Sequence, residues 1–133
     1  HNLTSSLSNL DPNNSYLKMK AKLFGTTSQG MIVDTKTIQT TTLFSVLEKE
    51  NLETIDFLKV DTEGHELQVL QGMKEKIKTI KHLLVEFHND EIYISYDPEF
   101  LHEYLISHNF KLIKKFKFPF TTWEDRLYTN LEK

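Results

Sequence analysis

The chain has 133 residues, no cysteine and a formal net charge of −3, so its length suits one soluble domain with a hydrophobic core. The lack of cysteine excludes disulfides and thiolate metal sites and fits a cytoplasmic protein. The weak negative charge gives no support for nucleic acid or an anionic membrane as a partner, and no apolar run approaches the ~20 residues of a transmembrane helix.

The first forty residues are predicted to form a loop and a hairpin. Residues 1–15 are rich in polar side chains without periodicity, which is typical of a loop. Residues 16–24 alternate apolar side chains with three lysines, Lys18, Lys20 and Lys22. This alternation predicts a half-exposed strand whose lysines face solvent, or else an anionic substrate. A second strand, rich in β-branched residues, is expected within 31–42 as its antiparallel partner.

The remainder, residues 41–133, is predicted to hold the strand-helix core. A threonine near 40 or 41 is expected to cap a short helix. Residues 55–60 predict a central strand that is buried on both faces. Apolar residues then recur every three or four positions, which predicts a helix over about 64–79. Gly72 falls inside that helix, where it costs ~1 kcal/mol relative to alanine, and we attribute it to close packing of helix on sheet.

The last third of the chain alternates again between strand and helix. A strand is expected over 82–87, and Asp97 followed by Pro98 predicts the start of a helix. Strands over 111–116 and 126–130 are expected to pair antiparallel. Because 55–60 and 82–87 are joined by one helix, we expect those two strands to be parallel neighbours.

Acidic residues follow both predicted parallel strands. Asp61 and Glu63 come directly after the first, and Glu86 and His88 end the second. The carboxyl ends of parallel strands meet at one edge of a sheet, where ligands bind, so these four side chains are expected to converge. Such a group suits a general base or a divalent metal. Alternatively, the first two acids only favour the positive end of the next helix, and the histidine is a hydrogen-bonded structural residue.

The stretch that carries these acids resembles a known enzyme family. Residues 55–66 read Ile-Asp-Phe-Leu-Lys-Val-Asp-Thr-Glu-Gly-His-Glu, with Leu-Gln-Gly behind them. This sequence resembles a motif of the FkbM family of S-adenosylmethionine-dependent methyltransferases. The likeness extends to Thr-Thr-Leu at 41–43, Val-Glu-Phe-His at 85–88, Trp-Glu-Asp-Arg-Leu-Tyr at 123–128 and a serine-rich segment at Ser5-Ser6-Leu7.

The resemblance implies a Rossmann-like α/β methyltransferase sheet in a single domain over 1–133, mostly parallel, with an antiparallel C-terminal hairpin. It implies O-methylation of a hydroxyl on a sugar, polyketide or similar small molecule. Enzymes of this family begin with a glycine-rich turn that cradles the cofactor, but the four glycines here form no such motif. We therefore expect an N-terminally truncated domain that lacks the main cofactor site and is inactive alone.

The resemblance also implies roles for the acids. Asp61 would orient or deprotonate the acceptor hydroxyl and lie near the sulfonium of the cofactor. Glu63 and Glu86 would hold the acceptor or a divalent metal, and His88 belongs to the same catalytic set. Weaker candidates are the serines at 5 and 6, which would hydrogen-bond a hydroxylated substrate, and His65. Three aromatic residues could cover the cleft, although they are more often core: Phe120, Trp123 and Tyr128.

Two other classes of function stay open. A metal-dependent hydrolase would use the same carboxylates, although the sequence lacks His-x-His and His-Glu-x-x-His. A non-catalytic α/β binding module would explain the missing glycine-rich turn. For the enzyme, we expect a hydroxylated small molecule as the partner. A truncated sheet would expose an apolar strand edge, so homo-oligomers are also expected.

Overall fold

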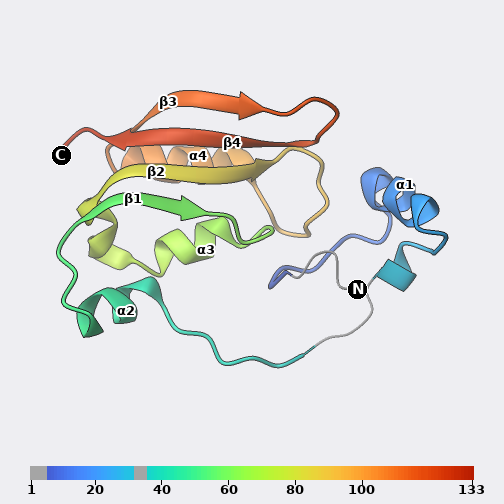
Figure 1. Cartoon of the computed structure of the whole chain (residues 1–133), viewed down its shortest axis with the longest axis horizontal. Helices are drawn as coiled ribbons and strands as arrows, with labels where there is room; N and C mark the ends of the chain where they lie inside the picture. The colour runs from blue at the N-terminus through green and yellow to red at the C-terminus, as the bar shows by residue number, and fades with distance from the viewer. Residues whose placement is uncertain (1–5, 32–35) are drawn as a thin grey trace.

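A computed structural model of the chain describes residues 6–31 and 36–133. It shows an α/β fold around an open four-stranded sheet with strand order β1-β2-β4-β3 (Figure 1). The elements are α1 (Ser15–Leu23), η1 (Gln29–Met31), α2 (Leu43–Lys49), β1 (Ile55–Val60), α3 (Glu66–Gln71), η2 (Lys74–Thr79), β2 (Ile80–His88), α4 (Pro98–Ser107), β3 (Phe110–Lys117) and β4 (Trp123–Asn130), where η marks a 3₁₀ helix. Within the described ranges, no helix combines the length and apolar character that crossing a bilayer requires.

The prediction that residues 55–60 and 82–87 form parallel neighbouring strands is confirmed. β1 pairs with β2 in parallel, with Val60 opposite Val85. β4 pairs antiparallel with both β2 and β3, so the expected C-terminal antiparallel pair is confirmed as well. This topology places the carboxyl ends of β1 and β2 at one edge of the sheet, and Figure 1 shows α1 beyond that edge.

Two predictions about the sheet are wrong for the described residues. The sheet is mixed rather than mostly parallel, with one parallel and two antiparallel pairings. β1 lies at the edge of this sheet instead of at its centre, and it is not buried on both faces. Phe57 is 55 % exposed, whereas Val60 is buried. An apolar run of this length fits a covered strand or an edge strand equally well, because the pattern does not reveal how many neighbours the strand has.

One face of the sheet carries the core. Leu83, Val85 and Phe87 alternate along β2 and are fully buried, because successive side chains of a strand point to opposite faces. They pack in one cluster with residues of the helices, including Leu101 of α4 and Leu70 of α3. The side chains in between, such as those of Glu86 and His88, therefore point to the opposite face.

Residues 15–23 form helix α1 rather than the predicted strand. The side chain of Asn14 caps this helix by accepting hydrogen bonds from the backbone N–H groups of Tyr16 (2.9 Å) and Leu17 (3.1 Å). Leu17 and Ala21 are buried one helical turn apart. Alternation of apolar residues also places pairs four apart, so the pattern was compatible with a helix, and the asparagine cap decides it.

The expected hairpin is also wrong. Of the predicted second strand, residues 32–35 lie outside the described residues, and 36–42 have no regular structure. The next helix, α2, is confirmed, but its cap is Thr42, whose hydroxyl accepts from the N–H of Ser45 at 3.2 Å.

The predicted helix over 64–79 is interrupted at Gly72. α3 ends at Gln71, and a 3₁₀ helix follows. The carbonyl of Gly72 accepts a hydrogen bond from the N–H of Phe44 (3.3 Å), and a Cβ added at this glycine would lie 3.6 Å from Cβ of Thr42. Close packing at this glycine is therefore against the start of α2, not against the sheet as predicted.

The C-terminal predictions hold with small shifts. The Asp97 side chain caps α4 by accepting from the N–H groups of Glu99 and Phe100, both at 3.0 Å. Pro98 occupies the first turn. β4 begins at Trp123, three residues before the predicted strand, so the preceding turn is shorter than expected.

Candidate active site

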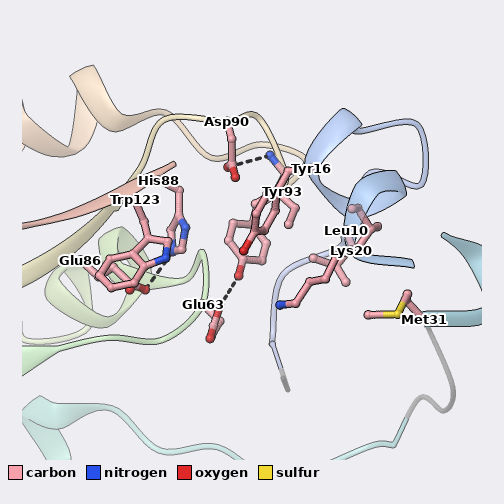
Figure 2. A pocket seen from close by; sticks show the side chains of 12 residues that line it. Leu10, Tyr16, Lys20, Met31, Glu63, Glu86, His88, Asp90, Tyr93 and Trp123 are labelled. Atoms are coloured by element: carbon pink, nitrogen blue, oxygen red, sulfur yellow. Dashed lines mark hydrogen bonds and ion pairs between the residues drawn. The ribbon is translucent and has the colours of Figure 1, made fainter. Parts of the chain in front are cut away.

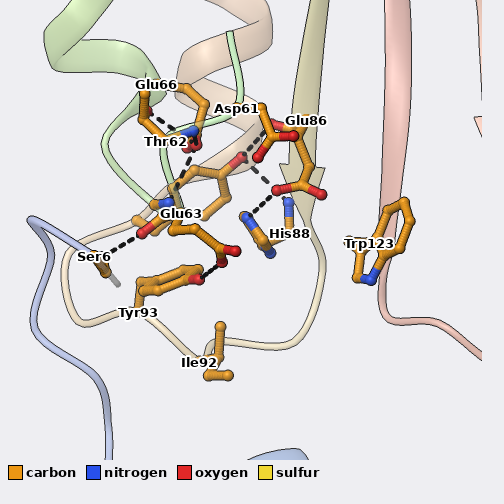
Figure 3. Close-up of polar contacts among 12 residues, drawn as sticks. Ser6, Asp61, Thr62, Glu63, Glu66, Glu86, His88, Ile92, Tyr93 and Trp123 are labelled. Carbon is orange, nitrogen blue, oxygen red and sulfur yellow. Dashed lines mark hydrogen bonds and ion pairs between the residues drawn. The ribbon is translucent and has the colours of Figure 1, made fainter. Parts of the chain in front are cut away.

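Three of the four predicted site residues come together at the carboxyl ends of β1 and β2. Glu63, Glu86 and His88 each offer a ligand atom, and these atoms all lie within 4.8 Å of one another. Figure 3 shows the three side chains pointing toward a common centre. We call these three residues the Glu-Glu-His cluster.

The turn after β1 sets the direction of Glu63. Glu66 is fully buried, and its Oε1 accepts hydrogen bonds from the backbone N–H of Thr62 (2.8 Å) and of Gly64 (3.2 Å). Glu63 and Gly64 both have positive φ, 54° and 89°. This left-handed pair reverses the chain, and the side chain of Glu63 extends toward Tyr93, whose hydroxyl donates a hydrogen bond to Glu63 Oε2.

Glu86 and His88 are two residues apart on β2, so they share one face of the sheet. They are 9 % and 6 % exposed, respectively. Nε2 of His88 lies 3.1 Å from Oε2 of Glu86, yet it has no partner in hydrogen-bond geometry among the described residues. Tyr93 and Tyr96 surround the imidazole, with ring centroids 4.8 Å and 5.5 Å from it and nearly perpendicular planes.

Burial and neighbouring carboxylates shift the pKa values of this pair. Burial raises the pKa of Glu86, and His88 offsets this only in part, while the charges of Asp61 and Glu63 reinforce it. Burial alone would lower the pKa of His88, but the contact with Glu86 and the charges of nearby carboxylates raise it above 6.5. Both groups therefore hold a proton more tightly than they would in water.

Two tyrosines that the sequence did not single out support the cluster. The Tyr96 hydroxyl accepts a hydrogen bond from the backbone N–H of His88 at 3.2 Å. Burial raises the pKa of Tyr93 and of Tyr96, so both hydroxyls keep their protons. The sequence did contain one signal that could have identified both tyrosines: they lie in the segment that follows a parallel strand, where ligand-binding residues gather.

Asp61 lies beside Glu86 (Figure 3) but is not a member of the cluster. Its carboxylate accepts a hydrogen bond from Nζ of Lys59 at 2.7 Å, and the side chain of Asp61 is 38 % exposed. Its predicted roles in catalysis and in cofactor binding stay predictions. Among the ion pairs of the described residues, Asp61 has a lysine partner, whereas Glu63 and Glu86 have none.

The weaker candidates fall in different places. The Ser6 hydroxyl donates to the backbone carbonyl of Glu63 and so holds the turn, whereas Ser5 lies outside the described residues. His65 caps α3 without a side-chain hydrogen bond to the helix. Of the three aromatic residues, Trp123 lines the cavity at the site, Tyr128 is core and Phe120 is fully exposed.

A cavity of about 190 Å³ opens between the Glu-Glu-His cluster and α1 (Figure 2). Leu17 of α1 packs against Ile92 and Tyr93, which holds the helix beside the sheet edge. Lys20, which was predicted to face solvent or an anionic substrate, lines this cavity. The lining residues are Leu10, Tyr16, Leu17, Lys20, Met31, Glu63, Glu86, His88, Asp90, Ile92, Tyr93 and Trp123.

Comparison of the sequence with models of known protein families identifies the family of this chain. The family model of the methyltransferase FkbM domain matches residues 2–112. The chain belongs to the FkbM methyltransferase family. The match includes both strands and all four predicted site residues, and it ends before the Trp-Glu-Asp-Arg-Leu-Tyr segment at 123–128. No curated protein and no solved structure matches this FkbM methyltransferase chain.

Methyltransferases generally use S-adenosylmethionine, but the described part of this FkbM chain does not fit that molecule. The cavity is smaller than the ~300–1,000 Å³ that pockets for drug-sized ligands usually have. The glycine nearest the cluster does not open a cradle either, because a Cβ at Gly64 would lie 2.6 Å from Cδ2 of Tyr93.

Proposed function

We propose that this chain forms the acceptor site of an S-adenosylmethionine-dependent O-methyltransferase that acts on a hydroxylated small molecule, such as a sugar or a polyketide. The observation that carries the proposal is the Glu-Glu-His cluster at the carboxyl ends of two parallel strands in an FkbM-family chain. Ligands of open α/β sheets bind at this edge.

The cluster supplies what an acceptor hydroxyl needs. Forming an O-methyl bond requires that the hydroxyl lose its proton, and a carboxylate within hydrogen-bond reach can take it. Glu86 is nearly buried beside the cavity and has no lysine or arginine partner among the described residues, so it is our choice as the proton acceptor. Glu63, fixed by Tyr93, accepts a hydrogen bond from the acceptor, and Asp61 contributes negative charge beside Glu86.

The rest of the cavity supports a ring that carries hydroxyl groups. Tyr16, Tyr93 and Trp123 present aromatic surface to the cavity. Amphipathic rings of this kind pack against the apolar face of a bound ring while their polar ends remain available. Lys20 adds an ammonium group at the α1 side of the cavity (Figure 2), which favours an acceptor that also carries an anionic group.

Product analysis tests the proposal. The full-length protein is incubated with S-adenosylmethionine carrying an isotope-labelled methyl group and with a panel of neutral and anionic sugars, phenols and polyketides. We expect label in an ether linkage at a hydroxyl oxygen, with more transfer to anionic acceptors in the wild type than in Lys20→Gln. Transfer only to nitrogen or sulfur, or transfer to none of these acceptors, would contradict O-methylation of this class of substrate.

A further inference from the structure

The Glu-Glu-His cluster has the composition and spacing of a cation site. Two carboxylates and one imidazole each offer a ligand atom, and these atoms lie within 4.8 Å of one another. We infer that Glu63, Glu86 and His88 together bind one first-row divalent transition-metal cation. The inference concerns the proposed acceptor site but does not depend on methyl transfer, because the cation can be bound without donor or acceptor.

The ligand atoms of Glu86 and His88 are already as far apart as two ligands of one ion. Nε2 of His88 and Oε2 of Glu86 are 3.1 Å apart. Two ligand atoms that each lie ~2.1 Å from an ion, at right angles to each other, are ~3 Å apart. Glu63 stands in the turn after β1, is partly buried, and already offers a carboxylate oxygen within 4.8 Å of the ligand atoms of Glu86 and His88.

The imidazole supplies a second, independent observation. His88 is more than nine-tenths buried, and its Nε2 points into the cluster without a partner in hydrogen-bond geometry. A buried polar atom without such a partner costs free energy. A cation bound along the lone pair of Nε2 removes that cost, whereas Glu86 alone is not aligned to do so.

The surroundings complete the site in the way that bound cations usually require. Tyr93 donates to Oε2 of Glu63 and leaves Oε1 available, which is the outer-shell contact that orients metal ligands. Asp61 and Asp90 add negative charge nearby. In the part of the chain that the structure describes, neither Glu63 nor Glu86 forms an ion pair with a lysine or an arginine.

The ligand set selects the class of ion. Imidazole favours transition metals, whereas Mg²⁺ and Ca²⁺ prefer oxygen ligands alone. We therefore expect Mn²⁺ or Zn²⁺ to bind more tightly than Mg²⁺. Each carboxylate has two oxygens, so Glu86 could hold the cation through one oxygen and leave the other free. A bound cation also lowers the pKa of a hydroxyl beside it, which supports the proposed reaction.

The direct test is a titration of the metal-free protein with Mn²⁺ in which the electron paramagnetic resonance signal measures the free ion. The methyl donor and the methyl acceptor are both left out. We expect one Mn²⁺ bound per chain. Displacing it should take at least a tenfold higher concentration of Mg²⁺ than of Zn²⁺. Failure to bind Mn²⁺ or Zn²⁺ at one per chain would overturn the inference. A protein that methylates its acceptor but binds neither ion contradicts this inference alone.

Variants locate the site. Removal of one of three ligands should weaken binding of Mn²⁺ at least tenfold in His88→Gln and in Glu63→Gln. The matched control is His82→Gln, because His82 lies on the same strand and face but is exposed, and its affinity should equal that of the wild type. Circular dichroism of the metal-free variants checks that they fold. If His88→Gln misfolds, Glu63→Gln still tests the site, because Glu63 is only partly buried. Wild-type affinity in Glu63→Gln, or equal losses in His82→Gln, would overturn the assignment.

Discussion

At the scale of single residues, the site depends on contacts between segments that are far apart in the chain. Four residues at the ends of two parallel strands were predicted to converge, because sheet topology brings strand ends together. Three of them, Glu63, Glu86 and His88, do so, and Asp61 does not join their cluster. The support by Tyr93 could not be predicted, because it depends on the left-handed turn at Glu63 and Gly64. The ion pair of Asp61 with Lys59 was not foreseen either, although Lys59 is only two residues earlier in the chain.

Gly64 is expected to be indispensable for this turn. Gly64→Ala places a Cβ 2.6 Å from Cδ2 of Tyr93 in a backbone conformation with φ of 89°. We expect a loss of about 2–4 kcal/mol in the free energy of unfolding, from the left-handed conformation and the collision together. Urea unfolding measures this loss. Gly25→Ala is the control, because Gly25 has φ of 66° but nothing near its Cβ; equal losses in the two variants would show that the collision has no effect.

The pH dependence of stability is expected to contain a contribution from Glu124. Burial would raise the pKa of Glu124, but the contact with Arg126 (2.7 Å) and nearby lysines lower it below 4.5. A group whose pKa is lowered by folding stabilises the fold above its unfolded pKa, and this stabilisation disappears as the pH falls through the folded pKa. The unfolding free energy of Glu124→Gln should therefore fall less steeply below pH 4.5 than that of the wild type.

Thermal or urea unfolding between pH 7 and pH 3 tests this expectation. Glu103→Gln is the control, since Glu103 is exposed on α4. An acid slope in Glu124→Gln that equals the slope of the control would contradict the role given to the Glu124–Arg126 pair.

At the scale of elements, strands and capped helices with one dominant signal could be predicted, and ambiguous patterns could not. α4 carries an aspartate cap and a proline, and both act locally. The alternation in 16–24 fits a strand by period two and a helix by its pairs four apart. The Asn14 cap and the burial of Leu17 and Ala21 on one side of α1 together resolve it. At the break, the Gly72 carbonyl also makes a tertiary contact with α2, which the sequence pattern does not reveal.

The cap of α1 provides a test at this scale. Asn14→Ala removes the two hydrogen bonds that start the helix, as well as a contact from its side-chain amide to the carbonyl of Asp90. Loss of an asparagine cap typically costs about 0.5–2 kcal/mol. We expect faster hydrogen exchange of the α1 amides with little change in β2. Asn13→Ala is the neighbouring control, and equal exchange in both variants would contradict the cap assignment.

At the scale of the whole molecule, the fold class could be predicted, but the place of β1 in the sheet could not. Periodicity identifies strands, and the helix between them fixes their parallel relation. The number of neighbours depends on the complete set of pairings. In the described residues, β1 has β2 on one side only, and Phe57 is exposed. An edge strand with an exposed aromatic residue is a surface at which chains associate.

Self-association through this edge is therefore expected. Light scattering after size-exclusion chromatography should show oligomers whose fraction rises with concentration. Phe57→Lys should shift the population toward monomer, because a lysine on an edge strand discourages pairing. Leu131→Lys is the control, since Leu131 is also a large exposed apolar residue but lies after β4. A wild-type protein that remains monomeric at all concentrations would contradict the prediction.

The central claim is that the Glu-Glu-His cluster takes the proton from the acceptor hydroxyl, and the turnover of Glu86→Gln tests it most directly. Glutamine keeps the size of the side chain but cannot accept the proton. In the full-length protein at saturating acceptor, we expect kcat to fall about 10²–10⁴-fold, while Glu103→Gln keeps the wild-type rate. Asp61→Asn should lose less, because that carboxylate is paired with Lys59. A folded Glu86→Gln variant with near wild-type kcat would contradict the account.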